Sequence, residues 1–184
     1  FAPRVENAAA YIIASPLNLL GELFTTRGQG TLIRRAVDLK SGKSYRNFSK
    51  AKLTTALEHA FDKRLEPGFF DTPLHRGFVD KEYNGGALFI ERDGLPYLSK
   101  FWVSRAARGE GIARDIWNAA TDDVGHFFWR SRTGNPFNDW YMRHCDGMQR
   151  SGPWRVFWRG LDAAQVATAI TSAGSAPDDF EPKS

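Results

Sequence analysis

The segment that most constrains the fold is an apolar strand that runs into a glycine turn and then into a helix. Residues Tyr97–Val103 have the apolar and aromatic character of a strand, and Arg108–Ala113 follow as Arg-Gly-Glu-Gly-Ile-Ala. Apolar residues then recur at helical spacing from Ile112 to Val124. A glycine turn at a helix start presents backbone N–H groups to one ligand. The segment is therefore a candidate phosphate-binding turn, to which Arg108 adds positive charge.

The same turn is also compatible with a simple helix start that carries solvated arginines. It lacks the Gly-Lys-Ser/Thr ending of a P-loop and the full spacing of a dinucleotide-binding fingerprint. The rest of the sequence has to decide between the two interpretations.

Strand and helix patterns alternate along the chain. We expect further strands near 75–80, 87–92, 126–132 and 154–158, and helices over 49–65, 112–124, 136–144 and 163–172. Asp93-Gly94 predicts a tight turn between two of the strands. The fold class predicted is mixed α/β (α+β), with a central, mostly antiparallel sheet flanked by helices.

Composition indicates one ordinary domain with short appended segments. The 184 residues are 42% hydrophobic and 25% charged, with a net charge of +4. We expect residues 1–36 to be an arm, 37–175 the domain and 176–184 a flexible tail. No apolar run approaches the ~20 residues that cross a bilayer, so no membrane partner is expected. The lone Cys145 lacks metal-ligand spacing, and no metal is expected.

A second group of functional candidates lies between residues 130 and 141. Arg130 and Arg132 are two residues apart, so on a strand they point to the same face. Two guanidinium groups there suit a carboxylate or phosphate, although solvated surface charges are the plainer interpretation. Asn135 opens a turn, and Tyr141 follows on the next helix, where a buried phenol is its ordinary role.

The turn at Arg108, Gly111 and Ala113 resembles the acetyl-CoA loop of the GNAT acetyltransferases, Arg/Gln-x-x-Gly-x-Gly/Ala. This resemblance implies acetyl-CoA as cosubstrate. Its phosphates would lie on the loop and its pantetheine on the main chain of the preceding strand. The implied residues are Phe101, Trp102, Val103, Arg108, Gly109, Glu110, Gly111, Ile112 and Ala113.

A closer resemblance covers about residues 36–162. The motifs Tyr97–Val103, Phe128–Arg132 and Asn135–Tyr141, in this order, are similar to the acetyltransferase domain of vertebrate-like N-acetylglutamate synthases, a group that includes bacterial bifunctional synthase/kinases. Residues 22–31 resemble the end of the amino-acid-kinase domain that precedes it. Trp102 stands where relatives often have a smaller aliphatic residue, although its backbone can still bind pantetheine.

The resemblance implies transfer of an acetyl group to the α-amine of L-glutamate, a step of arginine biosynthesis, by direct attack in a ternary complex. It assigns glutamate binding to Lys63, Lys100, Arg130, Arg132 and Asn135, and protonation of the departing thiolate to Tyr141. A lysine within an apolar strand, such as Lys100, independently indicates a partner, because an unpaired buried ammonium is unfavourable.

Several points stay open at this level. The group that deprotonates the amine is Tyr97, Glu91 through a water, or solvent. Cys145 as an acetylated nucleophile is a weaker alternative, since only the adjacent His144 offers a base. A GNAT enzyme with another amine acceptor, a catalytically silent regulatory domain and a basic nucleic-acid-binding module are the competing functions.

The remaining expectations follow from the resemblance. They are an upstream amino-acid-kinase domain in the same chain, a homo-oligomer in the full-length protein, no nucleic acid partner, and a bacterial cytoplasmic location.

Overall fold

The computed structural model describes residues 10–13, 31–34, 37–108 and 111–181, which divide between two compact units, 1–37 and 38–184. In the first unit, β1 (Ala10–Ile13) pairs antiparallel with β2 (Thr31–Arg34). The segment 22–30, part of the predicted kinase-domain remnant, lies outside the described residues. The candidate site belongs entirely to the second unit.

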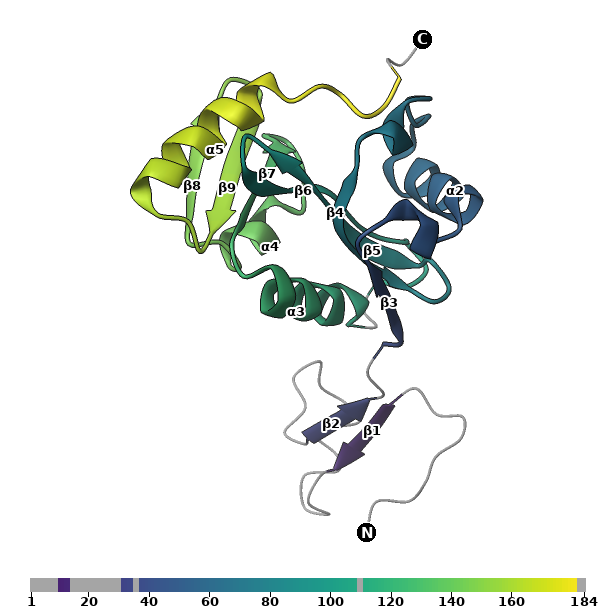
Figure 1. The fold of residues 1–184 in the computed structure, drawn as a ribbon. Helices are drawn as coiled ribbons and strands as arrows, with labels where there is room; N and C mark the ends of the chain where they lie inside the picture. The colour runs from purple at the N-terminus through teal and green to yellow at the C-terminus, as the bar shows by residue number, and fades with distance from the viewer. Residues whose placement is uncertain (1–9, 14–30, 35–36, 109–110, 182–184) are drawn as a thin grey trace. The chain divides into compact units, whose positions relative to one another are not determined.

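The second unit is built on a seven-stranded sheet of order β3-β4-β5-β6-β7-β9-β8 (Figure 1). Its neighbours are antiparallel except for β6 and β7, which are parallel. The strands are β3 (Leu39–Gly42), β4 (Leu74–Asp80), β5 (Gly85–Arg92), β6 (Leu95–Val103), β7 (Phe127–Arg132), β8 (Gly147–Ser151) and β9 (Trp154–Arg159). The predicted mixed fold with a mostly antiparallel sheet is confirmed.

In the described part of this unit four α-helices flank the sheet, and local signals in the sequence set their ends. The helices are α2 (Lys50–Phe61), α3 (Ile112–Val124), α4 (Asn138–Met142) and α5 (Ala163–Ser175), with 3-10 turns η2 (Tyr45–Asn47) and η3 (Phe69–Asp71). Ser49 caps α2 by accepting from the Lys52 N–H. Asp162 forms a capping box at α5 with Gln165. The helix expected to reach residue 65 ends at Phe61, because Asp62 adopts a left-handed conformation.

The helices bury the two faces of the sheet in separate clusters. Leu53 and Leu57 of α2 pack in the cluster that contains Trp102 of β6, and Ala169 of α5 packs in the one that contains Tyr97. On the other face, Phe101 meets Trp117 of α3 at a ring-centroid distance of 5.6 Å. Helices α2 and α5 therefore cover one face, and α3 with α4 covers the other (Figure 1).

A bulge in β6 decides which of its side chains reach which face. Leu88 of β5 pairs with Lys100, whereas the next residue, Phe89, pairs with Leu98. Ser99 is thus the extra residue, and strand alternation is reversed beyond it. Lys100 consequently lies on the face of α2 and α5, and Phe101 on the face of α3 and α4.

The described part of the segment expected to be a tail, residues 177–181, pairs with the chain that follows α2. The Asp179 carbonyl accepts from the Glu66 N–H at 3.1 Å, and the Glu181 N–H donates to the Arg64 carbonyl at 2.9 Å. Phe180 also forms a β-bridge with Leu65. Residues 177–181 form an extended segment that pairs with the chain after α2 through these backbone bonds. No local pattern in the sequence signals this pairing.

Two strands of the seven-stranded sheet, β3 and β8, were not predicted, and neither were β1 and β2 of the first unit. Strands β3 and β8 are four or five residues long and rich in polar and glycine residues, so neither shows an apolar period. Within the described ranges no helix is long and apolar enough to cross a membrane.

Candidate active site

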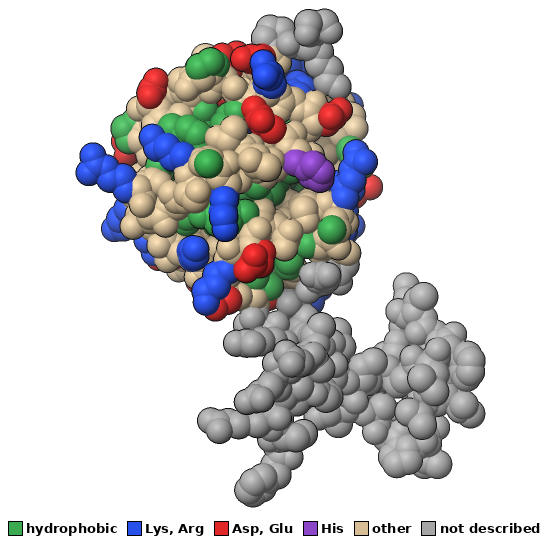
Figure 2. Space-filling view, turned by 90° about the vertical axis from the view of Figure 1, so that its right-hand side faces the viewer, with side chains coloured by type: hydrophobic (Ala, Val, Ile, Leu, Met, Phe, Trp, Pro, Cys, Tyr) green, Lys and Arg blue, Asp and Glu red, His purple; other side chains and the backbone are tan. Residues whose placement is uncertain are grey.

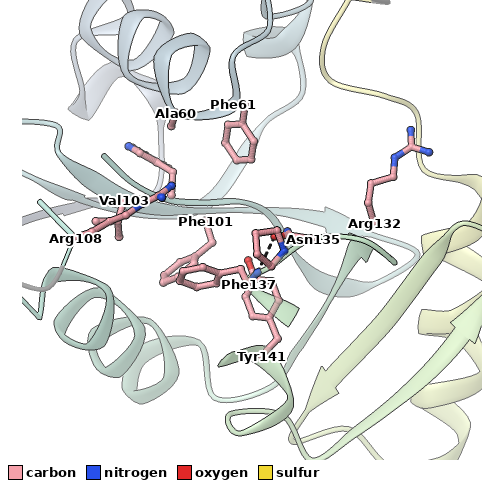
Figure 3. A pocket seen from close by; sticks show the side chains of 11 residues that line it. Ala60, Phe61, Phe101, Val103, Arg108, Arg132, Asn135, Phe137 and Tyr141 are labelled. Carbon is pink, nitrogen blue, oxygen red and sulfur yellow. Dashed lines mark hydrogen bonds between the residues drawn. The ribbon is translucent and has the colours of Figure 1, made fainter. Parts of the chain in front are cut away.

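A pocket of about 340 Å³ opens where β6 and β7 separate (Figure 3). Among the described residues the only pairing between these strands joins Tyr97 to Phe128, so they diverge toward their C-terminal ends. The lining residues come from α2, β6, the turn after β6, β7, the segment that leads into α4, and α4 itself. They are Ala60, Phe61, Phe101, Trp102, Val103, Arg108, Arg132, Asn135, Pro136, Phe137 and Tyr141.

One wall of the pocket is the main chain of β6. Phe101, Trp102 and Val103 pair with β5 on one side, opposite Ala87, Gly86 and Gly85. On the side of β7, the pairings of the described residues end at Tyr97. Polar main-chain groups of β6 therefore face the pocket and can pair with an extended amide-containing ligand such as pantetheine. This arrangement fits the cosubstrate implied by the sequence.

The turn after β6 leads directly into α3. Gly111 is the N-cap of α3 and has φ 78°, a left-handed conformation that favours glycine. Arg108 lines the pocket beside it, while Ile112 is buried and Ala113 is partly buried in the first turn of the helix. Gly109 and Glu110 of the predicted loop lie outside the described residues.

Tyr141 enters the pocket from α4, on the side opposite Phe61 of α2 (Figure 3). The tyrosine is 7% exposed and packs on Phe137 and Trp129, with ring centroids 5.4 and 5.5 Å away. Burial raises the pKa of the Tyr141 phenol well above its ordinary value, and nearby Tyr97 adds to this rise. The hydroxyl therefore stays protonated at neutral pH, as a proton donor requires.

Asn135 supports the shape of this wall. Its Oδ1 accepts from the Phe137 N–H at 2.9 Å, and its Nδ2 donates to Ser131 Oγ at 2.8 Å. The side chain thereby fixes the turn that leads into α4, in addition to lining the pocket.

Arg130 and Arg132 point to one face of β7, as predicted. Both guanidinium groups lie over the Trp154 ring of β9, with their central carbons 3.9 and 4.0 Å from its centroid. Arg130 is nearly enclosed, with a side-chain exposure of 7%, whereas that of Arg132 is 55%. The indole thus makes a cation–π contact with each of the two guanidinium groups.

Lys100 lies on the same face of the sheet and is 4% exposed. Its ammonium forms an ion pair with Asp179, and Arg130 and Arg132 both lie near Asp178, at 3.6 and 3.7 Å. Burial lowers the pKa of Lys100, and the charge of Asp179 opposes this effect. The partner predicted for a buried strand lysine is therefore present, and it comes from the end of the domain.

Other candidates lie away from the pocket lining. Tyr97 is buried beside Phe128, and burial raises its pKa to about 12. Glu91 is an exposed residue of β5, opposite Pro96. Lys63 is exposed in the turn after α2. Burial raises the pKa of Cys145, which disfavours the thiolate that a nucleophile needs.

Sequence reasoning missed the contribution of α2 and of the last described residues to this region. Phe61 lines the pocket and meets Phe180 at 5.0 Å between ring centroids. An apolar residue at the exposed end of a helix that carries core leucines was the available signal. Asp178 and Asp179 had none, since adjacent acidic residues near a terminus ordinarily remain solvated.

The fold matches that of solved GNAT acetyltransferases. A putative acetyltransferase of the GNAT family from Desulfovibrio desulfuricans superposes with a TM-score of 0.51 at 14% identity, over 67% of this chain and 98% of that one. Together with the separated strands and the glycine turn, this likeness defines the class of fold as the GNAT fold.

The family is more specific than the fold class. Residues 40–176 match the family described as NAT, the N-acetyltransferase of N-acetylglutamate synthase. The chain is 35% identical over 159 residues to an acetylglutamate kinase of Xylella fastidiosa, and 33% identical over 183 residues to the mitochondrial N-acetylglutamate synthase of Danio rerio. It belongs to this N-acetyltransferase family.

These alignments cover 86% and 96% of this chain, but only 38% and 34% of the two relatives. The chain thus spans little more than a third of the length of the curated relatives it matches.

Proposed function

We propose that this domain transfers the acetyl group of acetyl-CoA to the α-amine of L-glutamate, giving N-acetyl-L-glutamate and CoA. The observation that carries the proposal is the pocket between β6 and β7, which joins the predicted acetyl-CoA strand to Tyr141 and Arg132 in a chain of the N-acetylglutamate synthase acetyltransferase family. The names of relatives from zebrafish and Xylella support glutamate chemistry.

In the proposed reaction, β6 and the turn at Arg108 and Gly111 hold acetyl-CoA. The main chain of Phe101–Val103 positions the thioester, and one of its N–H groups stabilises the oxyanion that forms when the neutral amine attacks. Tyr141 then donates its proton to the sulfur as the carbon–sulfur bond breaks. The raised pKa of Tyr141 supports this acid role.

The acceptor is proposed to bind through cations of the α2 and α5 face. Lys100, Arg130 and Arg132 supply three positive charges. Two of them can pair with the two carboxylates of glutamate, and the third leaves a net positive charge that attracts the dianionic side of the substrate. Lys63 reaches this site only if its exposed side chain turns toward it on binding. Asn135 contributes by fixing the pocket wall.

We assign the removal of the ammonium proton to solvent. A tyrosine whose pKa is raised to about 12, as for Tyr97, holds its proton at neutral pH and is a poor base. Glu91 is exposed and does not line the pocket.

An enzyme fits the surface better than a nucleic-acid-binding module does. On the face that carries α2, Lys and Arg side chains are interspersed with Asp and Glu and form no continuous basic stripe (Figure 2).

We further propose that the domain works beside an amino-acid-kinase domain in a homo-oligomeric protein of the bacterial cytoplasm. The names of the acetylglutamate kinases of Xylella and Xanthomonas support the neighbouring kinase domain and the bacterial source.

The test is production of N-acetylglutamate by the purified chain from acetyl-CoA and glutamate, measured by mass spectrometry, with other amino acids and small amines as parallel acceptors. Arg130→Ala should raise the KM for glutamate at least about tenfold, since it removes a charge-assisted contact, with little change in the KM for acetyl-CoA. Absence of product at any glutamate concentration, or faster acetylation of a cationic amine, contradicts the proposal.

A further inference from the structure

The residues after α5 run across the cationic face of the site. Backbone hydrogen bonds tie Asp179 to Glu66 and Glu181 to Arg64. Phe180 lies against Phe61, which itself lines the active-site pocket. We call residues 177–181 the C-terminal strap.

The strap places two carboxylates on three cations. Asp179 pairs with Lys100, and Asp178 lies 3.6 Å from Arg130 and 3.7 Å from Arg132. The main chain of the strap also contacts this site, since the Pro177 carbonyl accepts a hydrogen bond from Arg130 at 2.9 Å. Each of the three cations, one on β6 and two on β7, is thus in contact with an acidic side chain of the strap.

The chemistry of this arrangement is that of a bound dicarboxylate. Two adjacent acidic side chains present two negative charges to these cations, and glutamate also carries two, on its α- and γ-carboxylates. The strap offers only main-chain amide nitrogens, which are not nucleophilic, so it can occupy the site without being acetylated.

We propose that the C-terminal strap is an intramolecular competitor for the acceptor, with Asp178 and Asp179 standing in for the two carboxylates of glutamate. This inference rests on the proposed function, because it takes Lys100, Arg130 and Arg132 to be acceptor-binding residues. Glutamate must displace the strap to bind, so the strap raises the KM for glutamate.

The geometry suits a competitor that can leave. The contacts of Asp178 exceed ordinary hydrogen-bond length, and its side chain is 64% exposed, so water and a ligand reach it readily. Asp179 is more enclosed, at 28% exposure. A tethered group has a local concentration of about millimolar, so even weak contacts compete with a free metabolite.

Two variants test the proposal by steady-state kinetics. Deletion of residues 177–184, and Asp178→Asn with Asp179→Asn in the full chain, should each lower the KM for glutamate about threefold or more, since the tethered competitor is lost. The values of kcat and of the KM for acetyl-CoA should stay the same. An unchanged or increased KM for glutamate overturns the proposal and makes the strap a structural counter-ion.

Asp123→Asn is the matched control. Asp123 also pairs with an arginine, Arg76, with 2.6 Å between Nε and Oδ2, but the pair joins β4 to α3 away from the strap. Its removal should leave the KM for glutamate unchanged.

A second measurement uses the unaltered protein, in case the variants fold poorly. Amide hydrogen exchange at Glu181 and Glu66, whose N–H groups form the strap's backbone bonds, should accelerate when glutamate is added at saturation. Unchanged exchange overturns the strap proposal whether or not turnover occurs. Absence of turnover in wild type and variants alike counts instead against the proposed function.

Discussion

Tyr97 and Phe128 form the one parallel bridge between β6 and β7 among the described residues, and their rings lie 5.0 Å apart. Beyond this pair the strands separate. The space between them is the pocket that Phe101–Val103 line from one side and Tyr141 from the other. The junction thus creates both the exposed main chain of β6 and the cavity in which it is exposed.

Tyr141→Phe should lower kcat by about 10²-fold, since it removes the proposed proton donor but keeps the ring that packs on Trp129. The KM for glutamate should change little. The assay is steady-state turnover at saturating acetyl-CoA. Tyr83→Phe is the control, because the Tyr83 hydroxyl accepts from the Ser49 N–H at 2.9 Å and lies outside the pocket lining. Equal kcat in Tyr141→Phe and wild type removes the acid role.

Tyr97→Phe should leave the shape of the kcat–pH profile unchanged between about pH 7 and 9. A phenol whose pKa is raised to about 12 remains protonated throughout this range, so it contributes no titration. The measurement is kcat at closely spaced pH values for both proteins. If kcat of the wild type rises with pH in this range and that rise is lost in the variant, Tyr97 is the base and the assignment to solvent is overturned.

Lys100→Met should alter how stability depends on pH. Burial lowers the pKa of Lys100 in the folded state, so above that pKa and below the ordinary 10.5 the unfolded chain binds more protons. The unfolding free energy of wild type relative to the variant should therefore rise with pH in the interval between the lowered pKa of Lys100 and 10.5. Urea unfolding of both proteins at several pH values measures this difference in unfolding free energy. A difference that falls with pH contradicts the burial argument.

Gly86→Ala should destabilise the domain by about 1–3 kcal/mol, the usual range for overpacking. A Cβ at this position would overlap the Trp102 ring, which crosses the strand pair β5–β6 there. Gly174→Ala is the control, since no atom lies within 4 Å of the added carbon and alanine favours a helix such as α5. Thermal unfolding of both variants decides between them, and equal melting temperatures would contradict the prediction.

Local signals in the sequence were sufficient for much of the fold. The cap at Ser49 and the turn at Asp93-Gly94 were predictable, because each depends on neighbours along the chain. The two turn residues have φ of 49° and 77°. So was the common face of Arg130 and Arg132, because strand periodicity determines it. The short strands β3 and β8 were missed, since they pair through backbone groups and have no apolar pattern.

The sequence by itself determined the strand, the glycine turn and the helix that make one side of the pocket, because each depends on side chains a few residues apart. Only the tertiary structure decided where the pocket opens and what neutralises its cations. The bulge at Ser99 reverses the strand alternation, so that Lys100 lies on the face of α2 and α5 and Phe101 on the face of α3 and α4. Asp179 reaches Lys100 across 79 residues of chain. Such contacts follow from packing and ion pairing between distant segments, and no local pattern in the chain encodes them.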